Sequence, residues 1–155
     1  ADAYNGFNLL VGRLDGPEFH YFSNRDGEPR RLEPGVYGLS NHLLDTPWHK
    51  VCLAKRRFRD LLEAGRVEPE ALFEMLADTR QAPEEELPDT GLDPEMERLV
   101  SAPFIVSERY GTRSSTLVLV EADRTVRFLE RTYGPDGRPE ETRRWQLEGA
   151  SGGFG

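Results

Sequence analysis

The chain of 155 residues has little cysteine: Cys52 is its only one. A single cysteine excludes an internal disulfide framework and a zinc site built from several cysteines. The longest aliphatic run, Leu117–Val120, is far too short to cross a membrane. The first residues do not have the pattern of a secretory signal. We therefore expect a cytoplasmic protein without a membrane span.

Basic residues are also scarce, with 20 Lys and Arg against 28 Asp and Glu, so the formal net charge is −8. This balance argues against nucleic acid as a partner and against an anionic membrane surface. The charge is concentrated in Pro83–Glu97, which holds seven carboxylates, three prolines and no Lys or Arg. We expect most of this segment to be a solvated loop, because proline fixes φ and like charges repel. The alternatives are a mobile flap over a site and an acidic contact for a partner.

Hydrophobic periodicity predicts an order of strands, then helices, then strands, which is typical of an α+β domain with helices packed on antiparallel sheet. The expected strands are Tyr4–Leu14, Glu18–Ser23, Arg30–Glu33, Val36–Ser40, Phe104–Ser107, Thr116–Val120, Thr125–Thr132 and Glu141–Leu147. Thr116–Val120 is continuously β-branched or aliphatic, so we expect both of its faces to be covered. The expected turns are 15–17 and 134–137, and 149–155 is expected to be a flexible tail.

Three helices are predicted from apolar stripes and capping residues. The first is expected to open at Thr46 as the cap with Pro47 behind it, and to end at Gly65. The second is expected to begin near Pro69, and the third after Asp93 as its cap. Trp48, Cys52, Phe58, Leu62 and Trp145 are among the side chains expected to be buried.

Three segments are more specific than the composition requires. They are Tyr4–Leu10 (YNGFNLL), the pair Tyr37–Asn41 (YGLSN) and Leu44–Trp48 (LDTPW), and Tyr110–Thr116 (YGTRSST). In this order they resemble the NRDE family, also called the transport and Golgi organisation family, and the resemblance covers almost the whole chain. The match is to the C-terminal part of the family domain. Residues 1–148 are therefore expected to form the C-terminal part of a single NRDE-type domain.

The resemblance implies an N-terminal-nucleophile hydrolase-like αββα sandwich, here lacking its N-terminal segment. Asn24-Arg25-Asp26 looks like the motif that gives the family its name, but Gly27 follows it where the family has Glu. That motif belongs near the family's N-terminus, shortly after the initiator Met and a cysteine. In related cysteine acylases the N-terminal Cys attacks an amide. Ala1 has no nucleophilic side chain, so no catalytic residue is expected in this chain.

By analogy with those acylases, Asn41 is expected to donate from its amide to an oxyanion. Arg113 is expected to supply a charge that lowers the pKa of the thiol. The secondary candidates are Asn5, Asn8, Ser40, Tyr110 and Thr112. The alternative for Asn41 is that it satisfies backbone groups before a helix, and the alternative for Arg113 is a place at a sheet end.

Two further groups of polar residues lie on the first predicted helix. His49 and Cys52 lie three residues apart and share a helix face, but two ligands are too few for a closed metal site, so none is expected. The basic residues Lys55, Arg56, Arg57 and Arg59 are expected to be a solvated helix face. The alternatives are an anion contact and an internal pairing with the acidic loop.

Two functions remain open from the sequence. The first is the handling or trafficking of a small amphipathic metabolite, with haem as the leading cargo and acyl-CoA-like lipids next. The second is an N-terminal-nucleophile Cys amidohydrolase whose catalytic residue lies outside this chain. The missing sheet strands would leave an exposed edge, so the expected partners include the protein's own N-terminal segment or another copy.

Overall fold

The computed structural model describes residues 5–13 and 18–148. Strands β1 (Asn8–Arg13), β2 (Glu18–Ser23) and β3 (Arg30–Leu32) form one antiparallel sheet in that order. Strands β4 (Ser114–Val120), β5 (Val126–Tyr133) and β6 (Pro139–Leu147) form a second one. Between the sheets along the chain lie α1 (His49–Glu63), α2 (Pro69–Leu76), the 3-10 turn η1 (Glu84–Glu86) and α3 (Pro94–Val100). The predicted α+β class and the C-terminal three-strand meander are confirmed.

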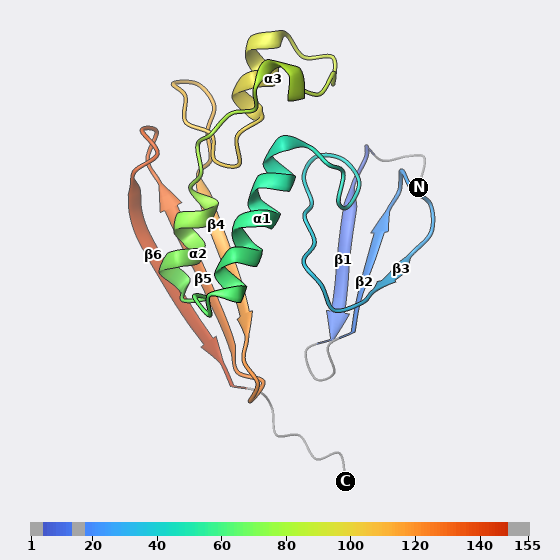
Figure 1. Cartoon of the computed structure of the whole chain (residues 1–155). Helices are drawn as coiled ribbons and strands as arrows, with labels where there is room; N and C mark the ends of the chain where they lie inside the picture. The colour runs from blue at the N-terminus through green and yellow to red at the C-terminus, as the bar shows by residue number, and fades with distance from the viewer. Residues whose placement is uncertain (1–4, 14–17, 149–155) are drawn as a thin grey trace.

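Helices α1 and α2 lie over one face of the β4–β5–β6 sheet, and β1–β3 lies on the other side of α1 (Figure 1). The core between helices and sheet is apolar because α2 and the strands each turn one face towards it. Its fully buried members are Leu72, Phe73, Leu117 and Leu129, and Phe58, Leu61, Leu76 and Leu119 pack against them. Helices α1 and α2 therefore pack on the second sheet, and this packing also positions the loop that leads into α1.

The expectation that strand β4 is covered on both faces is wrong. Leu117 is buried against the helices, but Val118 is 56% exposed on the opposite face. The reason is that helices cover only one side of this sheet among the described residues. On the open side Phe128 contacts Trp145 edge-on, with ring centroids 5.5 Å apart. Trp145 was expected in the core but is 47% exposed.

The predicted strand at Val36–Ser40 is not formed. Both backbone groups of Gly38 form hydrogen bonds with Asp45 instead of with a neighbouring strand. The Gly38 N–H donates to Asp45 Oδ1 (2.7 Å), and the Gly38 carbonyl accepts from the Asp45 N–H (2.7 Å). Helix α1 begins at His49 and not at Thr46. The Thr46 hydroxyl instead donates to the Leu43 carbonyl (2.8 Å) and lies 2.8 Å from His42 Nδ1, and Trp48 occupies the N-cap position without a side-chain bond.

The predicted strand at Phe104–Ser107 is also not formed. Here the backbone of Ile105 bonds to Thr112 across a short loop. The Ile105 N–H donates to the Thr112 hydroxyl (3.0 Å), and the Ile105 carbonyl accepts from the Thr112 N–H (2.8 Å). These two bonds close the loop without building a ladder, so a stretch with strand-like composition stays irregular.

Several helix boundaries follow the sequence closely. Helix α2 begins at Pro69, and Asp93 caps α3 by accepting from the Met96 N–H (3.0 Å). On α1, Cys52 and Leu62 are exposed, against the expectation that they belong to the apolar stripe.

The strand start at residue 4, the turn at 15–17 and the tail at 149–155 lie outside the described residues. Within the described ranges, no helix combines the length and apolar character that a bilayer crossing requires.

Candidate functional site

The loop from Val36 to Trp48, called here the 36–48 loop, carries the second sequence motif and leads into α1. Asp45 organises it from a left-handed backbone conformation (φ 61°), which Asp tolerates better than most residues. Its Oδ1 accepts from the Gly38 N–H and from Lys55 Nζ (2.5 Å). Burial alone would raise the pKa of Asp45, but these hydrogen bonds and the Lys55 charge lower it below its usual value. The loop is thus fastened to α1 by an ionised carboxylate.

Gly38 allows this loop to pack closely on α1. A Cβ at this position would lie 2.7 Å from Val51 Cγ1, which is inside the contact distance of two carbons. A larger residue would therefore push the loop away from the helix. Close packing on α1 therefore explains the glycine of the YGLSN motif. The same motif contains the site candidates Ser40 and Asn41.

A buried tyrosine ties the same loop to the first sheet. Tyr21 on β2 donates from its hydroxyl to Asn8 Oδ1 (2.6 Å) and accepts from the Leu44 N–H (3.1 Å). Asn8 Nδ2 donates onward to the His42 carbonyl (3.0 Å). Asn8, a secondary site candidate, therefore holds the loop against β1 with both ends of its amide.

Replacement of Tyr21 by phenylalanine is expected to destabilise the chain by about 1–2 kcal/mol, because a buried N–H and an amide oxygen lose their partner. Urea unfolding followed by circular dichroism measures this. Tyr37→Phe is the matched control: the Tyr37 hydroxyl bonds the Glu33 carbonyl (2.8 Å) at an exposed site, so a smaller loss is expected. Equal losses in the two variants would contradict a structural role for the Tyr21 hydroxyl.

An apolar cleft of about 920 Å³ lies between the 36–48 loop, α1, α2, α3 and β4. Most of its lining is apolar, including Leu39, Val51, Phe58, Met75, Leu76, Met96 and Ile105. Its polar lining includes Ser40, Asn41, Lys50, Lys55 and Tyr110. Three of the sequence candidates, Ser40, Asn41 and Tyr110, therefore border one apolar space.

A second, more polar cavity of about 960 Å³ lies on the β1 side of the 36–48 loop. Asn8, Ser40 and Asn41 line it together with Ser23 and Arg25. Ser40 and Asn41 border both this cavity and the apolar cleft. The structure thus gathers three candidates from two separate motifs around the same loop.

The remaining candidates lie elsewhere. Arg113 is exposed at the start of β4, where its carbonyl accepts from the Tyr133 N–H (2.9 Å), and it lines none of the cavities that Asn41 borders. Thr112 is engaged with Ile105. The Asn5 carbonyl accepts from Asn24 Nδ2 (3.1 Å). The structure does not bring Asn41 and Arg113 into one cavity.

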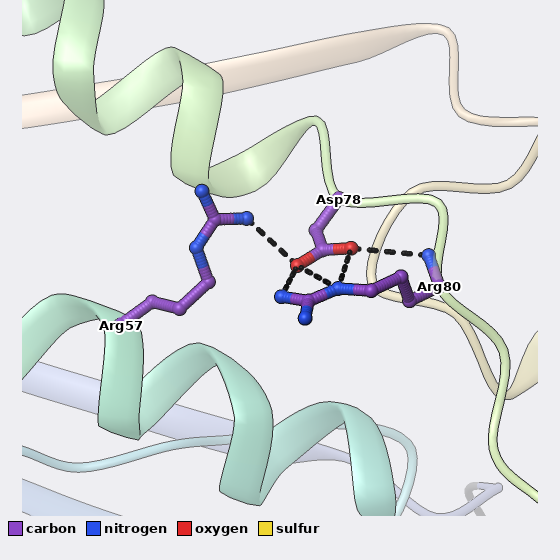
Figure 2. Close-up of polar contacts among 3 residues, drawn as sticks. All are labelled: Arg57, Asp78 and Arg80. Carbon is purple, nitrogen blue, oxygen red and sulfur yellow. Dashed lines mark hydrogen bonds and ion pairs between the residues drawn. The ribbon is translucent and has the colours of Figure 1, made fainter.

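Two of the four basic residues of this run on α1 form ion pairs, but with carboxylates outside Pro83–Glu97 and not with the acidic loop, and Arg56 and Arg59 are exposed. Lys55 binds Asp45, and Arg57 binds Asp78 (2.7 Å). Figure 2 shows Asp78 between Arg57 and Arg80. Hydrogen bonds from Arg80 in the first place, with Arg57 contributing, hold the pKa of Asp78 far below its usual range against the opposing effect of burial. Asp78 was not singled out from the sequence, where an isolated Asp after a helix carries no signal.

His49 binds the acidic segment instead of pairing with Cys52. Its Nδ1 lies 2.6 Å from Glu86 Oε2, and Cys52 is exposed on the helix surface. In the part of the chain that the structure describes, no group of three or more His, Cys, Asp or Glu side chains is placed to hold a metal ion. The contact does attach the segment Pro83–Glu97 to the N-terminal end of α1.

Together these features define an α+β protein with an apolar cleft beside a tightly bonded loop. A family model described as Transport and Golgi organisation 2 matches residues 1–135. The chain belongs to this transport and Golgi organisation family, which confirms the resemblance carried by the three motifs.

Named relatives agree with the family model. The chain is 40% identical over 152 residues to the Transport and Golgi organization protein 2 homolog of Bos taurus, covering 90% of this chain and 55% of that protein. The identity to the homolog of Mus musculus is 36% over 155 residues, covering 92% and 55%. For the homolog of Homo sapiens it is 38% over 141 residues, covering 83% and 51%. The chain thus spans about half the length of these relatives.

Proposed function

We propose that the apolar cleft binds a small amphipathic metabolite, which the protein handles or traffics. The observation that carries the proposal is the cleft itself: about 920 Å³ lined mainly by apolar side chains from α1, α2, α3, β4 and the irregular segments that connect them. Ligand sites are typically concave, apolar and supplied with a few polar groups that set orientation. A cleft of this volume is large enough for a flat macrocycle or a folded acyl chain.

The polar lining favours a ligand with an anionic end. Lys50 and Lys55 both border the cleft, and the Asn41 amide lies on the loop between the two cavities. Lys55 is already paired with Asp45, whereas among the described residues the hydrogen bond of Lys50 goes to a backbone carbonyl, that of Val100 (3.0 Å). Lys50 is therefore the cation with more capacity for a carboxylate or propionate.

Haem remains the first candidate cargo and an acyl-CoA-like lipid the second. Among the described residues that line the cleft, Met75, Met96 and Tyr110 carry sulfur or oxygen atoms of kinds that bind haem iron in proteins. The same methionines suit an acyl chain, because thioether side chains adapt to irregular apolar shapes. The two cargoes differ in their spectroscopic signature, so one experiment separates them.

Leu39→Asp is expected to weaken binding at least tenfold, because it places a carboxylate in the apolar wall facing an anionic ligand. The measurements are a haemin titration followed by the Soret band and a palmitoyl-CoA titration followed by calorimetry. At least one ligand should bind the unmodified chain saturably at micromolar protein concentration.

Leu62→Asp is the matched control, since Leu62 is a similarly exposed leucine on α1 that does not line the cleft. It should bind both ligands as the unmodified chain does. The proposal is contradicted if neither ligand gives a saturable change, or if the two aspartate variants weaken binding equally.

The alternative function, an N-terminal-nucleophile Cys amidohydrolase, rests on a different observation. The polar cavity of about 960 Å³ gathers Asn8, Ser40 and Asn41, which are amide and hydroxyl groups suited to an oxyanion. The nucleophile would come from outside this chain. A full-length reading frame without a cysteine behind its initiator methionine would exclude this function.

We also propose that the two sheets belong to an αββα sandwich completed by the protein's own N-terminal segment or by another copy. Support comes from apolar side chains exposed on both sheets: Leu9, Leu10 and Val11 on β1, and Val118, Val120, Trp145 and Leu147 on the second sheet. Apolar sheet surface of this kind favours a covering layer. A cytoplasmic location belongs to the same proposal, and cell fractionation tests it.

A further inference from the structure

A small chamber lies at the N-terminal end of α1, beside the apolar cleft. Its volume is about 140 Å³, and its walls include Asn41, His49, Lys50, Thr90 and Glu97. It shares Lys50 and Asn41 with the cleft and is also bordered by the acidic segment and α3. The proposed cleft function makes no use of Glu97, so this chamber requires a separate explanation.

Glu97 is the first unusual feature of the chamber. It belongs to the most acidic stretch of the chain, yet it is only 5% exposed. Its Oε1 accepts from the backbone N–H of Thr90 (2.7 Å) and from the Thr90 hydroxyl. The backbone N–H of Leu92 also acts on the carboxylate, but among the described residues the buried Oε2 has no partner in hydrogen-bond geometry. Buried carboxylate oxygens in folded proteins are normally hydrogen-bonded, so Oε2 calls for a donor.

Lys50 is the second feature. Its ammonium donates to the Val100 carbonyl (3.0 Å) and lies 5.6 Å from the ring centroid of Trp48. An ammonium has three donors, so this one can serve a further acceptor. The Glu97 charge acts on Lys50, but the ion pairs among the described residues do not include one between these two side chains. One small chamber therefore presents a cation and an anion that do not neutralise each other by contact.

We propose that the chamber is a binding site for a small α-amino acid of the size of glycine or alanine. The ammonium of the ligand donates to Glu97 Oε2, and its carboxylate accepts from Lys50 Nζ. A volume of about 140 Å³ admits a ligand of this size. Each charge of the zwitterion meets an opposite charge of the protein, which neither a simple carboxylic acid nor a simple amine achieves.

The directions of the pKa shifts of Glu97 and Lys50 agree with the proposal. The hydrogen bond from the Thr90 side chain, above all, holds the pKa of Glu97 below its usual value although burial opposes this. Burial lowers the pKa of Lys50, and the Glu97 carboxylate counteracts that effect. The site goes beyond the proposed cleft function, because it needs no amphipathic ligand.

Calorimetric titration of the chain with L-alanine, propionate and ethylamine tests the proposal. Propionate lacks the ammonium and ethylamine lacks the carboxylate, so each can satisfy only one of the two charges. Saturable binding of alanine is expected, at least tenfold tighter than that of either analogue. Equal binding of all three compounds, or no saturable binding of alanine, overturns the proposal.

Glu97→Gln removes the charge and keeps the shape, and it is expected to weaken alanine binding at least tenfold. Glu95→Gln, on the exposed side of α3, is the matched control and should bind alanine as the unmodified chain does. Circular dichroism first establishes that each variant is folded. Lys50→Met provides a second variant if Glu97→Gln does not fold, and it should lose alanine binding to the same extent. Unchanged binding in a folded Glu97 or Lys50 variant overturns the assignment.

Discussion

Phe73→Ala is expected to destabilise the chain by about 3–5 kcal/mol, as large-to-small substitutions of buried aromatic residues do. Phe73 is 1% exposed and lies on α2 in the buried cluster with Leu117 and Leu129 of the second sheet. Removal of its ring loses apolar burial and leaves a cavity that the hydrogen-bonded strands of the sheet cannot readily fill. Urea unfolding at 25 °C, followed by far-ultraviolet circular dichroism, measures the change.

The ring of Phe73 also supports an ion pair at the surface. The Arg131 guanidinium lies 4.1 Å from the ring centroid, and its two terminal nitrogens bond both carboxylate oxygens of Glu70 (2.8 Å each). Loss of the ring removes the platform that orients Arg131, so the effect extends from the core to the α2–β5 contact. The substitution thus tests the attachment of α2 to the sheet.

Phe7→Ala is the control for this prediction. Phe7 is partly exposed before β1 and contacts Phe22 with ring centroids 5.9 Å apart, far from the helical layer. Its loss is expected to be smaller than that of Phe73→Ala, because Phe7 is 39% exposed and gives up less buried area. If Phe7→Ala and Phe73→Ala cost the same, the helices do not anchor on the second sheet as described. Phe73→Leu measures the same contact with a smaller loss if the alanine variant is unfolded.

Elements defined by local patterns were predictable from the sequence. The predicted strand Glu18–Ser23 agrees with β2 residue for residue, and Pro69 and Asp93 mark the starts of α2 and α3 as expected. Alternation, proline at a first helical turn and an Asp cap act within a few residues, so a single sequence contains the whole signal. The same reasoning gave the meander of the last three strands.

Elements decided by contacts across the chain were not predictable. Val36–Ser40 has strand-like composition, but its glycine bonds Asp45, and nothing local announces that partner. The run of aliphatic residues in β4 is compatible with one covered face or with two. Which of these occurs depends on how many layers pack on the sheet, and this is a tertiary property.

The candidate site residues show the same difference between local patterns, which were predictable, and contacts across the chain, which were not. Ser40 and Asn41 were found because an unusual local motif carried them, and they do border both large cavities. The Asn41–Arg113 pairing required two motifs to meet in space, and the structure places Arg113 on an exposed strand end. Lys50 and Glu97 were missed because a lysine on a helix and a glutamate in an acidic run are ordinary in sequence. Their burial distinguishes them only in the folded chain.

Asp78→Asn is expected to destabilise the chain by about 2–3 kcal/mol at pH 7, because it removes the charge from a hydrogen-bonded carboxylate that is 7% exposed. The carboxylate accepts from Arg57 Nη1 (2.7 Å), from Arg80 Nη2 (2.6 Å) and from the Arg80 N–H (3.0 Å), as Figure 2 shows. The Asp78 carbonyl accepts from the Phe104 N–H (2.9 Å). Asp78 thus connects α1, the segment after α2 and the start of the last third of the chain.

The pH dependence of this effect follows from the direction of the pKa shift. The pKa of Asp78 is lowered in the folded chain, so its ionised form stabilises the fold above the unfolded pKa of about 3.9. The contribution is lost as the pH falls below that value and through the folded pKa. The free energies of unfolding of the unmodified chain and of Asp78→Asn should therefore differ most at pH 7, and the difference should shrink at pH 3 and further at pH 2.

Asp60→Asn separates the ion-pair effect from a general effect of charge, since Asp60 is exposed on α1. Its free energy of unfolding should stay within about 0.5 kcal/mol of the unmodified chain at each pH. A loss for Asp78→Asn that is independent of pH would mean that packing of the side chain, and not its charge, holds α1 to the segment after α2. Because Arg57 and Arg80 are both partly exposed, water screens the pair, and a loss well above about 3 kcal/mol would point to the same conclusion.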